Sequence, residues 1–183
     1  MELRTLIPGI MLWFLLPLWF LAGVADYLLH RRTQIETTSG IGESRLHVLQ
    51  AIEIGIPLLA GLFLEISSGV LAILILFVLA HTATALWDTS YSNPRRYISP
   101  FEQHVHSHLE YIPIVAVALV VVLHWDAFLA LFGAGPSPPS FDIKLKSNPV
   151  PLPYVLAVLT PLFAQSLLLT EETLRSARGT RIA

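Results

Sequence analysis

The sequence has no cysteine and few charged residues, and both shortages restrict what the chain can do. Without cysteine it forms no disulfide, has no thiolate nucleophile, and offers a metal ion only nitrogen and oxygen ligands. Only 13% of its 183 residues are charged, whereas about a quarter are charged in an ordinary soluble domain. The formal net charge of -2, together with the lack of a basic stripe with interleaved aromatic residues, argues against a nucleic-acid partner.

Apolar residues, by contrast, make up 54% of the chain and come in long blocks. A helix of about 20 apolar residues spans the ~30 Å hydrocarbon core of a bilayer. The sequence therefore predicts an all-α, polytopic membrane bundle of about five transmembrane helices, forming a single domain over residues 1–183. The expected spans are 8–30, 43–65, 70–88, 100–124 and 153–170, with a proline-rich loop at 133–152.

Basic residues are unevenly divided between the two ends of this predicted bundle. Eight lie at one end: Arg31, Arg32, Arg45, Arg95, Arg96, Arg175, Arg178 and Arg181. Three lie at the other end: Arg4, Lys144 and Lys146. Because basic residues favour the cytoplasmic side, we expect the N-terminus outside and the C-terminus in the cytoplasm of a cell that carries the chain in its inner membrane.

Acids and histidines recur near the predicted cytoplasmic ends of four helices. Residues four apart on a helix share one face, and ~1.5 Å of rise per residue places most of these side chains roughly 6 to 12 Å from the helix ends. Polar groups are costly inside a bilayer and mark functional sites there. The sequence thus predicts a metal site near the cytoplasmic face, with candidate ligands Asp26, His30, Glu43, His47, His81, Asp88, His104 and His108. So many ligands suit two metal ions better than one.

Two further acids lie deeper in their predicted helices. Glu53 and Glu110 are each about ten residues from a helix end, where a carboxylate without a partner is costly. They are candidates for a catalytic role, for extra ligands or for partners of the histidines. His106 and Glu110 share a face opposite His108, so the fourth helix offers two rival pairs, and we favour the pair His104 and His108.

Other ionisable residues have structural explanations. Ser99-Pro100-Phe101-Glu102 reads as a capping box, in which Glu102 bonds the helix N-terminus. His124, beside Trp125, fits a membrane interface. We therefore leave Glu102 and His124 out of the predicted site.

The spacing of these residues resembles that of the histidine-rich integral membrane di-iron enzymes, the hydroxylases and desaturases of lipids and alkanes. The resemblance rests on His104-x-x-x-His108, on Asp26-x-x-x-His30 and Glu43-x-x-x-His47 as acid-substituted versions of this spacing, and on His81. The chain has no adjacent histidine pair and more acids than those enzymes. The resemblance implies a helical membrane oxidase with a metal centre.

The leading functional hypothesis is a membrane oxidoreductase in which two metal ions, with iron favoured, act on a lipophilic substrate. A separate electron donor is expected, because the sequence has no G-x-G-x-x-G motif. The alternative is a zinc-dependent membrane hydrolase with Glu53 or Glu110 as general base, although the H-E-x-x-H signature is missing. A metal or proton carrier is a third possibility, disfavoured by the lack of an internal repeat.

Overall fold

The computed structural model describes residues 2–179, and regular structure in this range is helical apart from one isolated β-bridge. The elements are α1 (Leu3–Ile10), η1 (Met11–Leu15), α2 (Leu16–Thr33), η2 (Ile35–Thr37), α3 (Gly40–Phe63), α4 (Ser68–Ser92), α5 (Pro100–Leu123), α6 (Trp125–Ala130) and α7 (Leu152–Gly179). Five helical segments are long and apolar enough to cross a membrane. The expected all-α bundle with five membrane-spanning helices is confirmed at this level.

The first span is longer than expected and contains a π-helical turn. It runs without a break from Leu3 to Thr33 through α1, η1 and α2. The helix therefore starts before Pro8, which we had expected at its first turn. Pro17 follows the π-helical turn. Because proline lacks the N–H that would bond the carbonyl of Trp13, a wider turn relieves the clash there.

The last span also extends past its predicted end. α7 continues to Gly179, nine residues beyond the expected end at 170. Two polar residues of this extension, Glu172 and Ser176, are buried. The segment is thus a continuation of the helix and not a solvated tail, while Arg181 lies outside the described residues.

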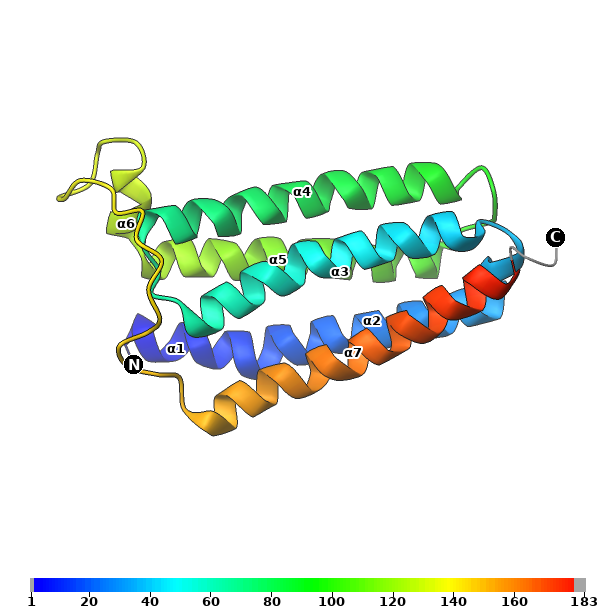
Figure 1. Cartoon of the computed structure of the whole chain (residues 1–183), viewed down its shortest axis with the longest axis horizontal. Coiled ribbons are helices and arrows are strands. Elements are labelled where there is room, and N and C mark those ends of the chain that lie inside the picture. Colours follow the sequence, from blue (N-terminus) through cyan, green and yellow to red (C-terminus); the bar gives the residue numbers. More distant parts are fainter. Residues whose placement is uncertain (1, 180–183) are drawn as a thin grey trace.

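The long helices form a closed ring in the order α2, α7, α3, α4, α5. α3 packs on α4 and α7, α2 packs on α5 and α7, and α4 packs on α5. The last helix of the chain, α7, therefore packs between the first two long helices, α2 and α3. Figure 1 draws it in orange along α2. In a ring of five helices one neighbouring pair must be parallel, and here it is α2 and α7.

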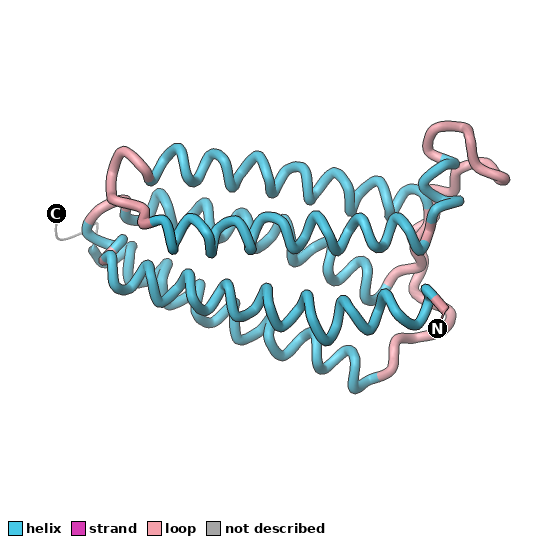
Figure 2. Tube along the Cα trace, turned by 180° about the vertical axis from the view of Figure 1, so that it is seen from behind, coloured by secondary structure: helices cyan, strands magenta, loops and turns pink. Residues whose placement is uncertain are grey.

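The ring has two distinct ends (Figure 2). At one end lie η2, the connection 93–99 between α4 and α5, and the end of α7. We call it the cluster end, after the group of ionisable side chains described below. At the loop end lie the start of α1, the α3–α4 turn and the long segment 131–151. This segment folds back on the α3–α4 turn, where Leu145 forms an antiparallel bridge with Leu64.

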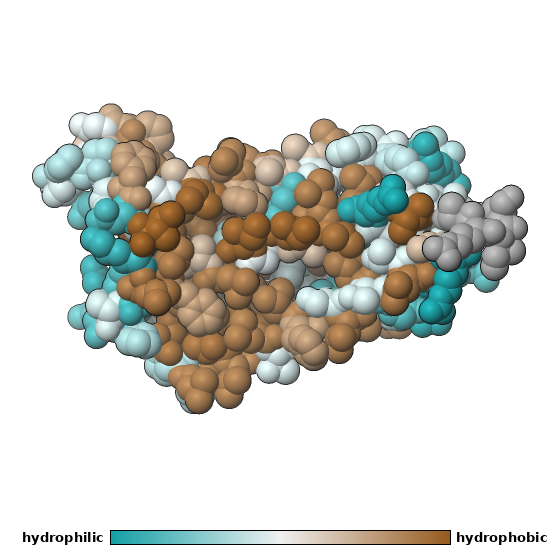
Figure 3. Space-filling model, viewed as in Figure 1, coloured by the Kyte–Doolittle hydropathy of each residue, from teal (hydrophilic) through white to brown (hydrophobic). Residues whose placement is uncertain are grey.

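The outer surface of the ring is apolar between its two polar ends (Figure 3). On α4, for example, Leu76, Leu79 and Leu86 are 64%, 61% and 71% exposed. Such large exposed side chains suit contact with lipid, because a water-soluble surface of this kind would aggregate. Which end of the bundle faces the cytoplasm stays a prediction from the charge distribution.

Two glycines of α3 provide a test of this packing. A methyl group on Gly42 would overlap the Tyr91 side chain of α4, whereas one on Gly55 would meet nothing within 4 Å. We expect Gly42→Ala to destabilise the protein by about 1–3 kcal/mol through overpacking. Gly55→Ala should stabilise it by up to about 1 kcal/mol, because alanine is the better helix former. Thermal unfolding of the purified protein in detergent measures both; equal effects would contradict the close approach of α3 and α4.

Candidate metal centre

Nine ionisable side chains meet inside the cluster end of the ring, and we call them the polar cluster. They share a continuous set of ion-pair contacts, and every helix of the ring contributes at least one. The members are Asp26 and His30 of α2, Glu43 and His47 of α3, Asp88 of α4, Arg96 of the 93–99 connection, Glu102 and His106 of α5, and Glu172 of α7.

Glu172 joins the two histidines at the centre of the cluster. Its Oε2 lies 2.9 Å from His30 Nδ1, and its Oε1 lies 2.7 Å from His47 Nδ1. An ionised carboxylate only accepts hydrogen bonds, so each Nδ1 carries a proton, and in the neutral imidazole each Nε2 is then the basic nitrogen. The two imidazole rings stack with centroids 4.7 Å apart and planes 5° from parallel. One carboxylate thus fixes the orientation and the tautomer of both rings.

The two basic nitrogens face carboxylates on the other side of the rings. His30 Nε2 lies 3.4 Å from Asp26 Oδ1 and 3.6 Å from Glu102 Oε1. Both Nε2 atoms are buried and form no hydrogen bond within the described part of the chain. A buried nitrogen that is held by a carboxylate behind it and faces oxygen ligands is the usual environment of a metal-binding histidine.

Similar distances connect the remaining members. His47 Nε2 lies 3.2 Å from Asp88 Oδ2, and His106 Nε2 lies 2.9 Å from Asp26 Oδ1. Asp88 also accepts a hydrogen bond from Gln50. Each of these imidazoles therefore has a carboxylate oxygen beside a nitrogen that could bind a metal.

Two overlapping groups within the cluster have the dimensions of a metal site. One ligand atom each from Asp26, His30 and His106 lie within 4.8 Å of one another, and the same holds for His30, Glu43 and His47. Both groups contain nitrogen and oxygen donors only, as iron, zinc and manganese sites do. Buried histidines and carboxylates of the bundle could thus hold a metal ion.

Arg96 is the one permanent cation among the cluster members. Its guanidinium donates to both carboxylate oxygens of Glu43, with an Nη2–Oε1 distance of 2.5 Å, and its Nη1 lies 2.6 Å from Glu102 Oε1. Burial alone would lower the pKa of Arg96, but the hydrogen bonds and charge of Glu43 and the charge of Glu102 outweigh burial and raise it. Arg96 is therefore charged at any physiological pH and ties α3 to α5.

The structure places the two favoured histidines of α5 away from the cluster. His104 is exposed, and the His108 ring contacts the His104 ring edge-on with centroids 4.7 Å apart. At 100° per residue, His106 lies about 200° around the helix from either one. The structure thus brings His106, and not the preferred His104 and His108, into the cluster. Glu110 forms no hydrogen bond or ion pair with the described members of the cluster.

His81 and Glu53 form a separate polar pair nearer the middle of the bundle. Glu53 accepts a hydrogen bond from Thr84 at 2.8 Å, and its Oε2 lies 4.0 Å from His81 Nδ1. Glu53 is six residues from His47 along α3, which is about 9 Å. The pair therefore lies between the cluster and the loop half of the bundle and does not join the other candidate ligands.

Besides Arg96, three members of the cluster were absent from the predicted ligand set: Glu102, His106 and Glu172. The acid-x-x-x-His spacing of α2 and α3 recurs in Glu102-x-x-x-His106, a signal that the capping-box interpretation of Glu102 concealed. In the structure Ser99 does cap the helix, accepting from the Glu102 N–H at 3.1 Å, but the Glu102 carboxylate points into the cluster. Glu172 had no comparable signal, because its role depends on how far α7 extends.

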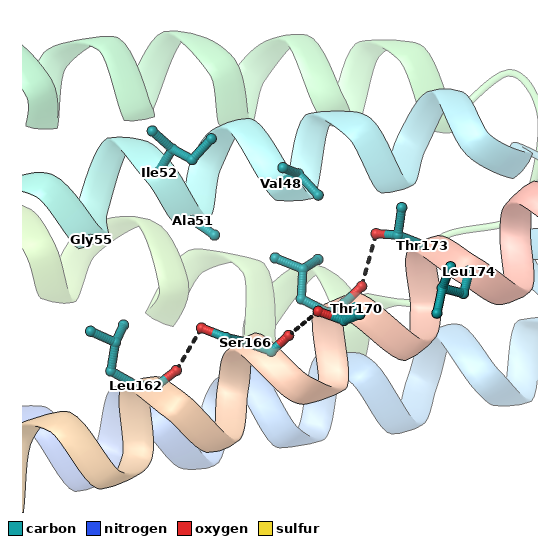
Figure 4. A pocket seen from close by; sticks show the side chains of 10 residues that line it. Val48, Ala51, Ile52, Gly55, Leu162, Ser166, Thr170, Thr173 and Leu174 are labelled. Atoms are coloured by element: carbon teal, nitrogen blue, oxygen red, sulfur yellow. Dashed lines mark hydrogen bonds between the residues drawn. The ribbon is translucent and has the colours of Figure 1, made fainter.

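A lipid-facing groove lies beside the cluster, between α3 and α7 (Figure 4). Val48 and Thr173, which directly follow His47 and Glu172 in sequence, line the end nearest the cluster. The hydroxyls of Ser166 and Thr170 donate to carbonyls of their own helix, so the groove offers a ligand mainly apolar surface. No candidate metal ligand among the described residues lines it.

Comparison of the chain with protein-family models, with curated proteins and with solved structures finds no match. The resemblance to membrane di-iron enzymes therefore rests on residue types and spacing alone.

His106 and His108 give a matched test of the cluster, because they are two residues apart on the same helix. We expect His106→Ala to lose bound metal, since its Nε2 lies in one of the two potential metal groups. His108→Ala should keep it. Metal content per chain, measured by elemental analysis of the purified variants, is the readout. Loss in His108→Ala alone would show that the opposite face of α5 binds the metal.

Glu172 can be tested against its neighbour Glu171. A glutamine at 172 has a single acceptor oxygen and cannot accept from both Nδ1 atoms. We expect Glu172→Gln to weaken metal affinity by about 10- to 100-fold, as is typical for loss of a carboxylate behind a ligand histidine. Glu171→Gln should leave the affinity unchanged, because Glu171 bonds Tyr27 and Arg31 on the surface instead. Metal titration of both proteins distinguishes them.

Proposed function

We propose that this chain is a membrane oxidoreductase in which the polar cluster holds two metal ions, with iron favoured, and acts on a lipophilic substrate. The observation that carries the proposal is the carboxylate of Glu172 behind both His30 and His47. It leaves two buried, basic Nε2 atoms directed at carboxylate oxygens. A pair of histidines that merely filled space would not need this arrangement.

The charges of the cluster support two divalent cations. Five carboxylates and one guanidinium carry a formal charge of minus four when the three imidazoles are neutral. Uncompensated charge is very costly in a buried site. Two divalent cations neutralise this charge, whereas one would leave half of it.

The donor set favours iron. Mixed imidazole and carboxylate ligands without sulfur, with open positions on the metal, are typical of non-haem iron sites that activate dioxygen. Iron bound here would supply redox chemistry with dioxygen that the amino acids themselves lack. The chain's own residues orient the ligands: Glu172 fixes the imidazoles, and Arg96 holds Glu43 and Glu102 in place. A separate electron donor is part of the proposal.

The surroundings of the cluster support a lipophilic substrate. The bundle around the cluster is apolar and exposes large hydrophobic side chains to its surroundings, so molecules dissolved in lipid reach its walls directly. The arginine distribution favours a cluster end at the cytoplasmic face of the cell membrane, where a soluble electron donor could dock. The Glu53–His81 pair lies close enough to the cluster to carry protons there. Of the two catalytic candidates, Glu53 and Glu110, we therefore retain Glu53.

A zinc-dependent hydrolase is the competing function, and one observation favours it. Each of the two metal groups has three protein ligands, the number found in catalytic zinc sites with one open position. Such a site would lower the pKa of a bound water to about 7. The five carboxylates exceed what one zinc ion needs, which is why we place this function second.

Metal analysis of the protein, purified both with and without oxygen, separates these functions. We expect about two irons per chain, an optical spectrum that changes on reduction, and oxygen consumption when a reductant is added. Asp26→Ala should abolish all three signals, and His108→Ala is the matched control that should retain them. Tightly bound zinc with no redox signal would favour the hydrolase. Protein that binds no metal even after reconstitution would refute both.

A further inference from the structure

An apolar cavity of about 450 Å³ fills the loop half of the ring. All the long helices and the segment 131–151 contribute to its wall. Along the first span it extends from Pro8 to Trp19, eleven residues apart, which is about 16 Å at 1.5 Å per residue. Its volume is in the range of small-molecule sites in proteins.

Two basic side chains, Lys146 and His124, line the cavity at the loop end. Burial lowers the pKa of His124, the positive charges of Lys146 and Arg4 lower it further, and the negative charge of Glu65 acts in the opposite direction. The nearby Glu65 is engaged by the backbone N–H and hydroxyl of Ser147, both at 2.8 Å. The Lys146 ammonium donates one hydrogen bond, to the Leu64 carbonyl, and has two further protons for an anion.

The inner end of the cavity points toward the polar cluster. Ile54 lines this end and directly follows Glu53, while Val78 lies one helical turn before His81. Along α2, Trp19 is seven residues from Asp26, or about 10 Å. The Glu53–His81 pair thus separates the end of the cavity from the cluster.

Gly61 of α3 lines the cavity and leaves space there that a side chain could fill. A glycine inside a helix is less favourable than alanine, and close approach of a neighbouring helix is a common reason for a glycine at such a position. A side chain at Gly61 would meet nothing within 4 Å, so no close approach explains this glycine. The glycine instead widens the cavity that it lines.

We propose that the cavity binds a single-chain lipid with an anionic end. The head lies at Lys146 and His124, and the hydrocarbon chain runs inward to Trp19. An extended chain advances slightly more than 1 Å per bond, so the cavity accommodates roughly a dozen carbon atoms. The basic side chain of Lys146 at the loop end and the mainly apolar wall of the cavity match this amphiphile. The binding site stands by itself; only the idea that the far end of this chain is what reacts rests on the proposed function.

Quenching of Trp19 fluorescence tests both binding and direction. Replacing Trp13, Trp87 and Trp125 by phenylalanine leaves Trp19 as the one tryptophan of the chain. Metal-free protein in detergent is titrated with dodecanoate brominated either at the methyl end or next to the carboxylate. We expect saturable quenching by the methyl-end probe, reversed by plain dodecanoate, and little quenching by the other probe. Equal, non-saturable quenching by both would mean partition into the micelle and would overturn the proposal.

Two glycine variants of the same helix locate the site. Gly61→Leu fills the cavity and should weaken binding at least 10-fold. Gly55→Leu is the matched control: it also enters open space, but in the α3–α7 groove of Figure 4, and binding should be retained. Loss of binding in Gly55→Leu alone would place the lipid in the groove and refute the cavity site.

Lys146→Gln tests recognition of the anionic end. We expect it to weaken binding of the brominated carboxylate several-fold and to leave binding of the brominated alcohol of equal length unchanged. Equal effects on both probes would refute the role of Lys146 in binding the head. Because these measurements use metal-free protein, their failure is distinguishable from failure of the proposed reaction, which is detected by metal content and oxygen consumption.

Discussion

The buried carboxylates at the cluster end impose the strongest constraint on this bundle. Like charges a few Å apart in a medium of low polarity repel strongly, and five acids there carry far more charge than Arg96 can balance. The interior must therefore supply further positive charge, as protons on the histidines or as metal ions. Glu172 favours metal ions, because it fixes the Nδ1 protons of His30 and His47 and directs their other nitrogens at oxygen ligands.

The closed ring of five helices makes this arrangement possible. α7 lies between α2 and α3, so a single side chain from it reaches both central histidines. The neighbouring Ser44–Ser176 hydrogen bond, at 2.8 Å, joins α3 and α7 at the same depth. The ring also encloses space, which is polar at the cluster end and apolar at the loop end. One architecture thus provides both a polar cluster that could hold metal ions and an apolar cavity.

The apolar and polar halves of the interior suggest two separate roles, binding in the apolar half and reaction in the polar half. An amphiphile held by its head at the loop end would present its far end toward the Glu53–His81 pair and the cluster beyond it. The distance between the head site and the cluster would then determine which part of the hydrocarbon chain lies nearest the cluster. The α3–α7 groove, in contrast, has hydroxyls that bond their own helix and no charged group to recognise a head.

The sequence by itself determined that the chain is suited to a lipid bilayer, that its fold is helical, and which residues form much of the cluster. Long apolar blocks set the spans, and the acid-x-x-x-His spacing placed Asp26 with His30 and Glu43 with His47, because such residues share a helix face. It could not decide which face of α5 points inward, since His104, His106 and His108 occupy both faces. Only the tertiary structure decided that, and it also placed Glu172 behind two histidines more than a hundred residues away in sequence. The reason is physical: periodicity defines a helix face, whereas the neighbour of that face depends on the order in which all five helices pack.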